Sequence, residues 1–136
     1  MGISEMHMQL LPGDNLLAFD CKDFGPSNIS LPGGHCRLDP SDLTLTTDCT
    51  SHSVLLDLPT LFLCPLTILT DTWCSSGTLP NASFFKSGGF NDGDHTMRLF
   101  ASITPTSDWT ETSVYLSTHR CVRWFSNRLI DEMASL

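Results

Sequence analysis

The chain has 136 residues, a length that fits one domain with a substantial hydrophobic core. Hydrophobic residues make up 40% of it and charged residues 16%, which excludes global disorder. Its formal net charge of −8 excludes nonspecific nucleic-acid binding, which needs a basic surface, and predicts repulsion from anionic membranes.

The N-terminal part of the chain contains a hairpin signal. Two apolar segments, residues 6–11 and 16–19, flank the turn sequence Pro12-Gly13-Asp14-Asn15. Apolar runs around such a turn predict a β-hairpin. Residues 24–42 follow and are dense in glycine and proline, which predicts a long loop.

The middle of the chain predicts several short strands. Residues 43–47 alternate between apolar and polar side chains, as a half-buried strand does. Residues 53–58, 61–64 and 66–69 are apolar pieces separated by Pro59 and Pro65, so we expect three short strands and no transmembrane segment. Residues 71–95 are rich in glycine and polar side chains, which predicts a loop with its strongest turn at residues 88–94.

The C-terminal part predicts a second hairpin and then a helix. Residues 97–103 and 113–118 are β-branched and aromatic, and they bracket a loop at residues 104–112. Val122, Phe125, Leu129 and Met133 then recur at helical spacing, which predicts an amphipathic helix over residues 121–135.

Together these elements predict a single, mainly β domain over residues 1–136. We expect a small antiparallel β-sandwich or barrel-like domain with a C-terminal amphipathic helix. An α+β arrangement, with one sheet covered by the helix, is the alternative.

Cysteine usage bears on the compartment. Six cysteines accompany two Asn-x-Ser glycosylation sequons, which begin at Asn28 and Asn81. This combination predicts disulfide bonds and an extracellular or luminal location. The first eleven residues are polar, include Glu5 and lack a basic leader, so they do not form a signal peptide. A cytoplasmic location is therefore the alternative.

One set of residues has the donor types of a zinc site. Cys49 and His52 form a Cys-x-x-His unit, and His119 and Cys121 form a His-x-Cys unit. Two thiolates and two imidazoles are a ligand set that tetrahedral zinc favours. The alternative is that these cysteines are buried or disulfide-bonded and that the histidines are ordinary polar residues. Apart from zinc, we expect no cofactor.

Two further motifs contain residue types found in catalytic or metal-binding sites, but their spacing matches no specific site. Cys36 follows His35 and two glycines. A cysteine nucleophile needs a nearby imidazole to lower its pKa. Adjacent side chains point apart in an extended chain, so that imidazole would have to come from another part of the chain. Asn91, Asp92, Asp94 and His95 cluster in one turn; a solvated turn is the simpler interpretation than calcium binding, since the EF-hand pattern is not met.

Aromatic residues in predicted loops indicate an interaction surface. Trp109 has only polar neighbours, and Phe84 and Phe85 precede a glycine-rich turn. Exposed loop aromatics contribute strongly to binding, and the alternative is that these three rings cap the core. We therefore expect a non-enzymatic β-rich interaction or structural module, with a protein partner or a homo-oligomer.

Such a module would belong to a secreted, cell-surface or virion-surface assembly. The alternatives are a small Cys/His- or zinc-dependent hydrolase and a subunit of a larger complex.

Overall fold

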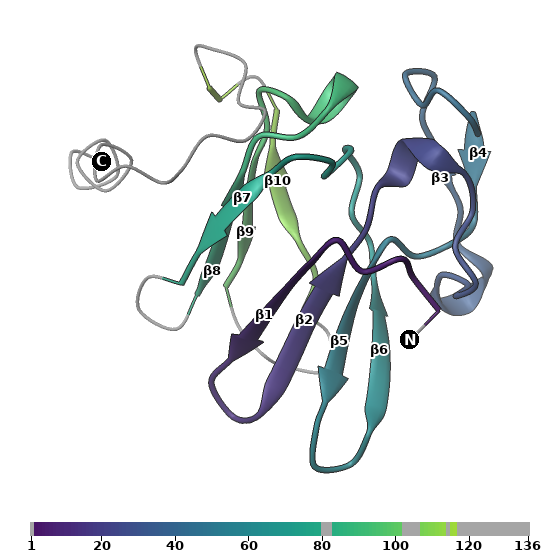
Figure 1. The fold of residues 1–136 in the computed structure, drawn as a ribbon. Helices are drawn as coiled ribbons and strands as arrows, with labels where there is room; N and C mark the ends of the chain where they lie inside the picture. Colours follow the sequence, from purple (N-terminus) through teal and green to yellow (C-terminus); the bar gives the residue numbers. More distant parts are fainter. Residues whose placement is uncertain (1, 80–82, 102–106, 114, 117–136) are drawn as a thin grey trace.

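The computed structural model describes residues 2–79, 83–101, 107–113 and 115–116 (Figure 1). Within these ranges the chain forms ten β-strands and three short 3-10 turns, and every strand pairing is antiparallel. The mainly β prediction is confirmed. The helix predicted over residues 121–135 lies outside the described residues. The described segments include no helix long and apolar enough to cross a membrane.

The first sheet contains β1 (His7–Leu11), β2 (Asn15–Phe19), β5 (Ser53–Asp57) and β6 (Phe62–Leu66), in the order β1-β2-β5-β6. The predicted N-terminal hairpin is confirmed, with Leu11 paired to Asn15 across the turn. Gly13 and Asp14 have φ angles of 75° and 56° there, values that glycine and aspartate tolerate better than most residues.

One predicted break in this sheet is wrong. Pro65 lies inside β6 and pairs with Val54, so residues 66–69 are not a separate strand. The physical reason is that β6 is an edge strand, and an edge position does not need the backbone N–H that proline lacks.

The second sheet contains β7 (Ser76–Thr78), β8 (Phe84–Ser87), β9 (Met97–Phe100) and β10 (Thr110–Thr112), in the order β10-β9-β8-β7. Two predictions fail here. β7 and β8 lie within residues 71–95, where we expected a loop, and β9 pairs with a strand at residues 110–112 instead of 113–118. Gly77 in β7 is covered by the Phe84 ring, so this strand depends on a contact that a local pattern does not show.

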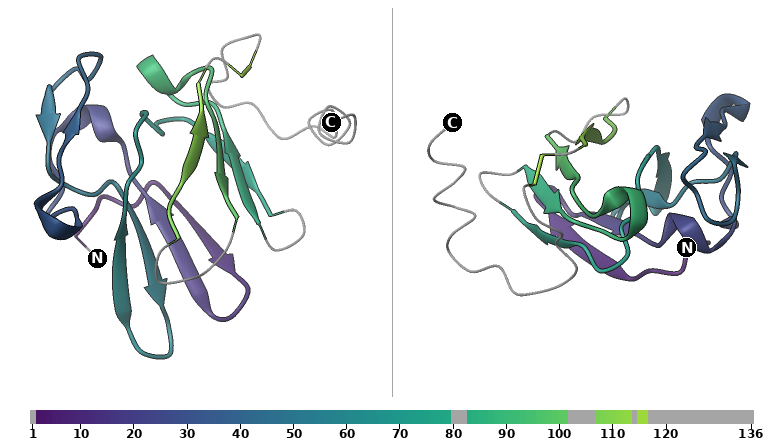
Figure 2. Two further views of the ribbon diagram at one scale, coloured as in Figure 1. Left: turned by 180° about the vertical axis from the view of Figure 1, so that it is seen from behind. Right: turned by 90° about the horizontal axis from the view of Figure 1, so that it is seen from above.

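Strands β3 (Arg37–Leu38) and β4 (Thr47–Asp48) and the first two 3-10 turns form a third, small region beside the two sheets, whereas the last 3-10 turn lies at the end of the second sheet (Figure 2). Strands β3 and β4 pair with each other, so the strand predicted over residues 43–47 is reduced to its C-terminal end. The 3-10 turns are η1 (Lys22–Phe24), η2 (Pro32–Gly34) and η3 (Asn91–Gly93). A disulfide between Cys36 and Cys49 closes the region next to β3 and β4.

The hydrophobic core lies between the two four-stranded sheets. Alternation along β2 and β5 points Leu17, Phe19 and Leu55 toward the second sheet, and Phe84 and Phe100 point back from β8 and β9. The indole ring of residue 109 completes this cluster. The core therefore fixes the two sheets against each other, and it also encloses the strand residues Lys86 and Arg98.

Candidate functional site

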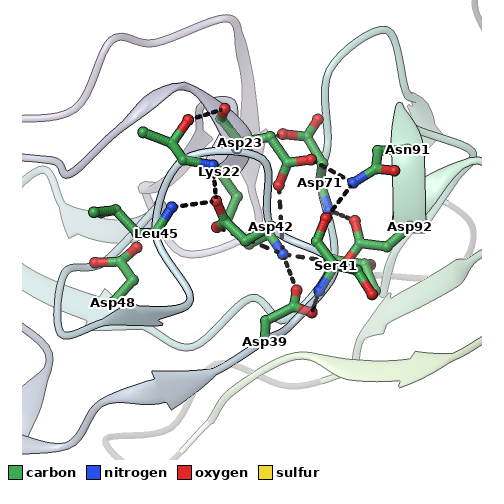
Figure 3. Close-up of polar contacts among 12 residues, drawn as sticks. Lys22, Asp23, Asp39, Ser41, Asp42, Leu45, Asp48, Asp71, Asn91 and Asp92 are labelled. Carbon is green, nitrogen blue, oxygen red and sulfur yellow. Dashed lines mark hydrogen bonds and ion pairs between the residues drawn. The ribbon is translucent and has the colours of Figure 1, made fainter.

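The most concentrated charge in the described part of the chain surrounds Lys22 (Figure 3). Lys22 is the first residue of η1, and its side chain is 1% exposed. Its Nζ forms an ion pair with Asp39 and lies 3.1 Å from Asp92, 3.5 Å from Asp23 and 3.9 Å from Asp42. We call these five residues the Lys22 cluster. Four carboxylates thus meet one ammonium group.

The carboxylates of the cluster also bind the backbone of the loops that supply them. Asp42 Oδ1 accepts hydrogen bonds from the N–H groups of Thr44 and Leu45, both at 2.8 Å. Asp92 Oδ1 accepts one from the N–H of Asp71 at 2.9 Å, and Asp39 Oδ1 accepts one from Ser41. The cluster therefore connects η1, the loop before β4, the segment before β7 and η3.

Two neighbouring side chains extend these connections. Asn91 Nδ2 donates to Asp23 Oδ2 at 2.8 Å and to the carbonyl oxygen of Ser41 at 2.7 Å. Asp71 Oδ2 accepts from the N–H of Asp23 at 2.8 Å. Figure 3 shows these residues gathered around Lys22, with the hydrogen bonds and ion pairs between them as dashed lines.

The pKa values of the cluster follow from burial and from Lys22. Burial raises the pKa of Asp23, Asp71 and Asp92. Burial also opposes ionisation of Asp39, but its hydrogen bond to Lys22 outweighs that effect and its pKa falls. Burial similarly disfavours the charged form of Lys22, yet its bonds to Asp39 and Asp92 raise its pKa. The ammonium group is thus the stable counter-charge of these loops.

A second buried polar network lies next to the first. His52 is 1% exposed, and its Nδ1 and Nε2 atoms lie 2.6 Å from Asp20 and 2.8 Å from Asp48. Arg37 forms an ion pair with Asp48 and donates to the carbonyl oxygen of Ile68. Burial opposes ionisation of Asp48, but hydrogen bonds from Thr50, His52 and the charge of Arg37 lower its pKa. Both imidazole nitrogens of His52 are therefore engaged with carboxylates.

The structure describes half of the predicted zinc set. Cys49 is in the disulfide with Cys36, and His52 lies between two carboxylates, whereas His119 and Cys121 lie outside the described residues. Zinc binding by the four residues stays a prediction. Among the described residues, no three His, Cys, Asp or Glu side chains are arranged to hold a metal ion.

Two of the described cysteines, Cys36 and Cys21, lack the features of a nucleophile. Cys36 is oxidised in the disulfide, so it has no thiolate to offer. The thiol of Cys21 borders a cavity of about 360 Å³, but burial and the charges of Asp71 and Asp20 raise its pKa to about 11. A thiol with that pKa is protonated near neutral pH.

The predicted interaction aromatics need a correction. Trp109 and Phe84 are 9% and 0% exposed, so both belong to the core and neither offers a surface to a partner. The polar neighbours of Trp109 are the misleading feature, because the indole turns inward while Asp108 and Thr110 are exposed. The structure does not describe the side chain of Phe85.

The other predicted positions have mixed outcomes. Asn28 is exposed, as a glycosylation acceptor must be, and Asn81 lies outside the described residues. Asp92 is a member of the Lys22 cluster, Asn91 donates a hydrogen bond to its member Asp23, and Asp94 pairs with His95 at 2.6 Å. Sequence reasoning missed the cluster itself. The sequence feature that could have indicated the cluster is the scarcity of lysine. The chain has two lysines and fifteen acidic residues, and both lysines are buried.

Comparison with known proteins gives one family and several relatives. The profile of the family "Glyoxal oxidase N-terminus" matches residues 6–133. The chain is 44% identical over 133 residues to aldehyde oxidase GLOX from Vitis pseudoreticulata, which covers 95% of the chain and 25% of that protein. It is 35% identical over 131 residues to the putative aldehyde oxidase Art an 7 from Artemisia annua, covering 95% and 21%.

A third relative, aldehyde oxidase GLOX1 from Arabidopsis thaliana, is 37% identical over 130 residues, covering 93% of the chain and 20% of that protein. The chain thus spans about a quarter or less of the length of these relatives. No solved structure matches the chain significantly.

Proposed function

We propose a structural function, starting from the fact that the chain belongs to the glyoxal oxidase N-terminus family. In this proposal the chain is a non-catalytic β-rich module of an aldehyde oxidase of the kind found in grape and Arabidopsis. The aligned share of each sequence supports the assignment to a module of a larger protein. The alignments take in nearly the whole chain but only 20–25% of each relative.

This proposal rests on what the buried charged side chains contact. Lys22 and its carboxylates bind one another and the backbone of their own loops, and His52 is held between Asp20 and Asp48. A catalytic acid, base or ligand needs an atom directed at a substrate, whereas these groups are directed at internal donors and acceptors. The networks therefore support a role in holding loops in place.

The proposal is tested by comparing two proteins. The first is the chain alone, and the second is a chimera of the grape relative in which this chain replaces the 133 matched residues. Aldehyde-dependent oxygen consumption is the readout. We expect turnover by the chimera and none by the chain; turnover by the chain alone would refute a non-catalytic role, and an inactive but folded chimera would refute membership of the oxidase assembly.

We also propose an extracellular or luminal location. The disulfide between Cys36 and Cys49 and the exposed sequon at Asn28 support it. Intact mass before and after deglycosylation tests the use of Asn28. Metal analysis of oxidised and reduced protein tests the zinc prediction, because reduction of the disulfide is required before Cys49 can act as a thiolate ligand.

A further inference from the structure

The glycosylation sequon at Asn28 lies at the edge of the cavity that Cys21 borders. Asn28 is exposed and lines this cavity, whose volume is about 360 Å³. Such a volume is at the lower end of the roughly 300–1,000 Å³ of ligand pockets, which suits one or two sugar rings and not a whole branched glycan. An oligosaccharide attached to Asn28 would therefore begin beside a cavity that matches the size of its first ring.

An exposed aromatic ring forms one wall of the cavity. Phe24 lines it and is 62% exposed. The ring stacks on Trp73, with centroids 5.1 Å apart and planes tilted by 33°, and Trp73 supports it without lining the cavity itself. The face of an aromatic ring is electron-rich, so the C–H groups of a sugar ring can pack against it favourably. Phe24 is thus a supported platform beside the attachment site.

The other walls suit a neutral ligand that is rich in hydrogen-bond donors. Ser4, Asp20 and Ser27 line the cavity, and none of the described residues that line it is basic. Asp20 is held by the backbone N–H of Ser4 at 3.1 Å and by His52 Nδ1 at 2.6 Å. A carboxylate has about four acceptor sites, so Asp20 keeps capacity for a hydroxyl or an amide N–H. A sugar supplies such donors, whereas an anion would meet no cation here.

We propose that the first N-acetylglucosamine of an N-glycan on Asn28 occupies this cavity and packs against Phe24. The covalent link favours this occupant over a free saccharide or a protein partner, because tethering gives an effective concentration on the order of millimolar. The inference rests on the proposed extracellular or luminal location, where sequons receive glycans, and it is independent of the oxidase role. The sugar then covers an aromatic side chain that the polypeptide leaves exposed.

Release of glycans from the folded protein tests the inference. The chain is secreted from a mammalian host with an added signal peptide and treated with peptide N-glycosidase, and peptide mass spectrometry follows Asn28 and Asn81 separately. We expect Phe24→Ala to speed release at Asn28 by roughly 2- to 10-fold and to leave release at Asn81 unchanged, because the ring contact must break before the enzyme can bind. Equal rates at Asn28 in the two proteins, or an Asn28 that stays unmodified in this host, would overturn the inference.

Matched variants separate the contact from general loosening of the fold. Phe62→Ala replaces a ring that is 68% exposed on β6 and does not line the cavity, so we expect release at Asn28 to stay slow. Phe24→Tyr keeps the aromatic face and should also leave it slow. An acceleration by Phe62→Ala equal to that by Phe24→Ala would contradict the inference.

Thermal melts provide an independent readout. Ser30→Ala removes the sequon and leaves Asn28 in place, so it is combined with Phe24 and with Phe24→Ala. The glycan should raise Tm by roughly 2–6 °C when Phe24 is present and by less than about 1 °C when it is alanine. An equal rise in both backgrounds would overturn the inference. The natural location is scored separately: coupling in the secreted chain, with an unmodified Asn28 in the protein from its own source, refutes the proposed location and retains the fit between sugar and cavity.

Discussion

Replacement of Trp109 is the most direct test of how the two sheets are held together. Its ring centroid lies 5.6 Å from that of Phe100 and 6.1 Å from those of Phe19 and Phe84, so it touches rings from both sheets. Its Nε1 donates to Ser53 Oγ at 2.8 Å. Trp109→Ala removes all of these contacts and leaves a cavity between the sheets.

The magnitude follows from the burial of the ring. Loss of a buried aromatic side chain costs about 3–5 kcal/mol, which for a domain of this size lowers Tm by roughly 10–20 °C. Trp109→Phe keeps most of the ring contacts but removes the hydrogen bond to Ser53, so it should cost only about 1–2 kcal/mol. Urea unfolding followed by circular dichroism measures both values.

An exposed tryptophan provides the control. Trp73 is 37% exposed and stacks on Phe24 with centroids 5.1 Å apart. Trp73→Ala should change the free energy of unfolding by less than about 1 kcal/mol, because its ring is only partly removed from water. Equal stability losses at the two tryptophans, or an unchanged melt for Trp109→Ala, would refute the placement of Trp109 in the core.

Three further predictions concern buried charge and the disulfide. Lys86 is fully buried without a hydrogen-bond partner for Nζ, and burial and the charge of Arg98 lower its pKa well below the ordinary value; Lys86→Met should therefore raise the free energy of unfolding. The unfolded chain keeps this proton to a higher pH than the folded chain, so wild-type stability rises with pH between the lowered pKa of folded Lys86 and about pH 10.4, and the advantage of Lys86→Met in urea melts should shrink as the pH rises toward 10; an advantage that does not change with pH would contradict a lowered pKa. Lys22→Met should cost about 3–5 kcal/mol at pH 7, because it leaves buried carboxylates without their counter-charge, and less at pH 5, where carboxylates of raised pKa take up protons; a loss that grows toward pH 5 would count against this. Reduction of Cys36–Cys49 should cost about 3 kcal/mol and add two titratable thiols, given the short loop that the bond closes; unchanged thiol counts would show that the bond is absent.

The parts of the fold that the sequence predicts correctly are set by neighbouring residues. The β1–β2 hairpin follows from Pro12-Gly13-Asp14 between two apolar segments, and β5 follows from an apolar run that ends at Pro59. β7 and β8 were missed because residues 71–95 combine several glycines with many polar side chains, a composition typical of loops. Gly77 is required there by the Phe84 ring that covers it, a contact that becomes visible only when the strands pair.

The candidate site was hard to predict for a similar reason. Lys22 and Asp92 are 70 residues apart in sequence, and each of them looks like an ordinary solvated charge in a loop. Convergence of η1 and η3 depends on both sheets being formed. Trp109 was misjudged from its polar neighbours, although a strand that alternates faces can carry one inward aromatic between outward polar residues.

The disulfide also bears on how fast the first sheet can assemble. β2 pairs with β5, yet residues 20–52 separate the two strands along the chain. The bond between Cys36 and Cys49 bypasses about a third of that segment. Since the entropy of loop closure grows with the logarithm of loop length, this shortcut lowers the closure cost by about 0.4 kcal/mol. The oxidised chain should then form its central strand pair about twice as fast as the reduced chain, so the redox state during synthesis governs how long the apolar strands stay unpaired.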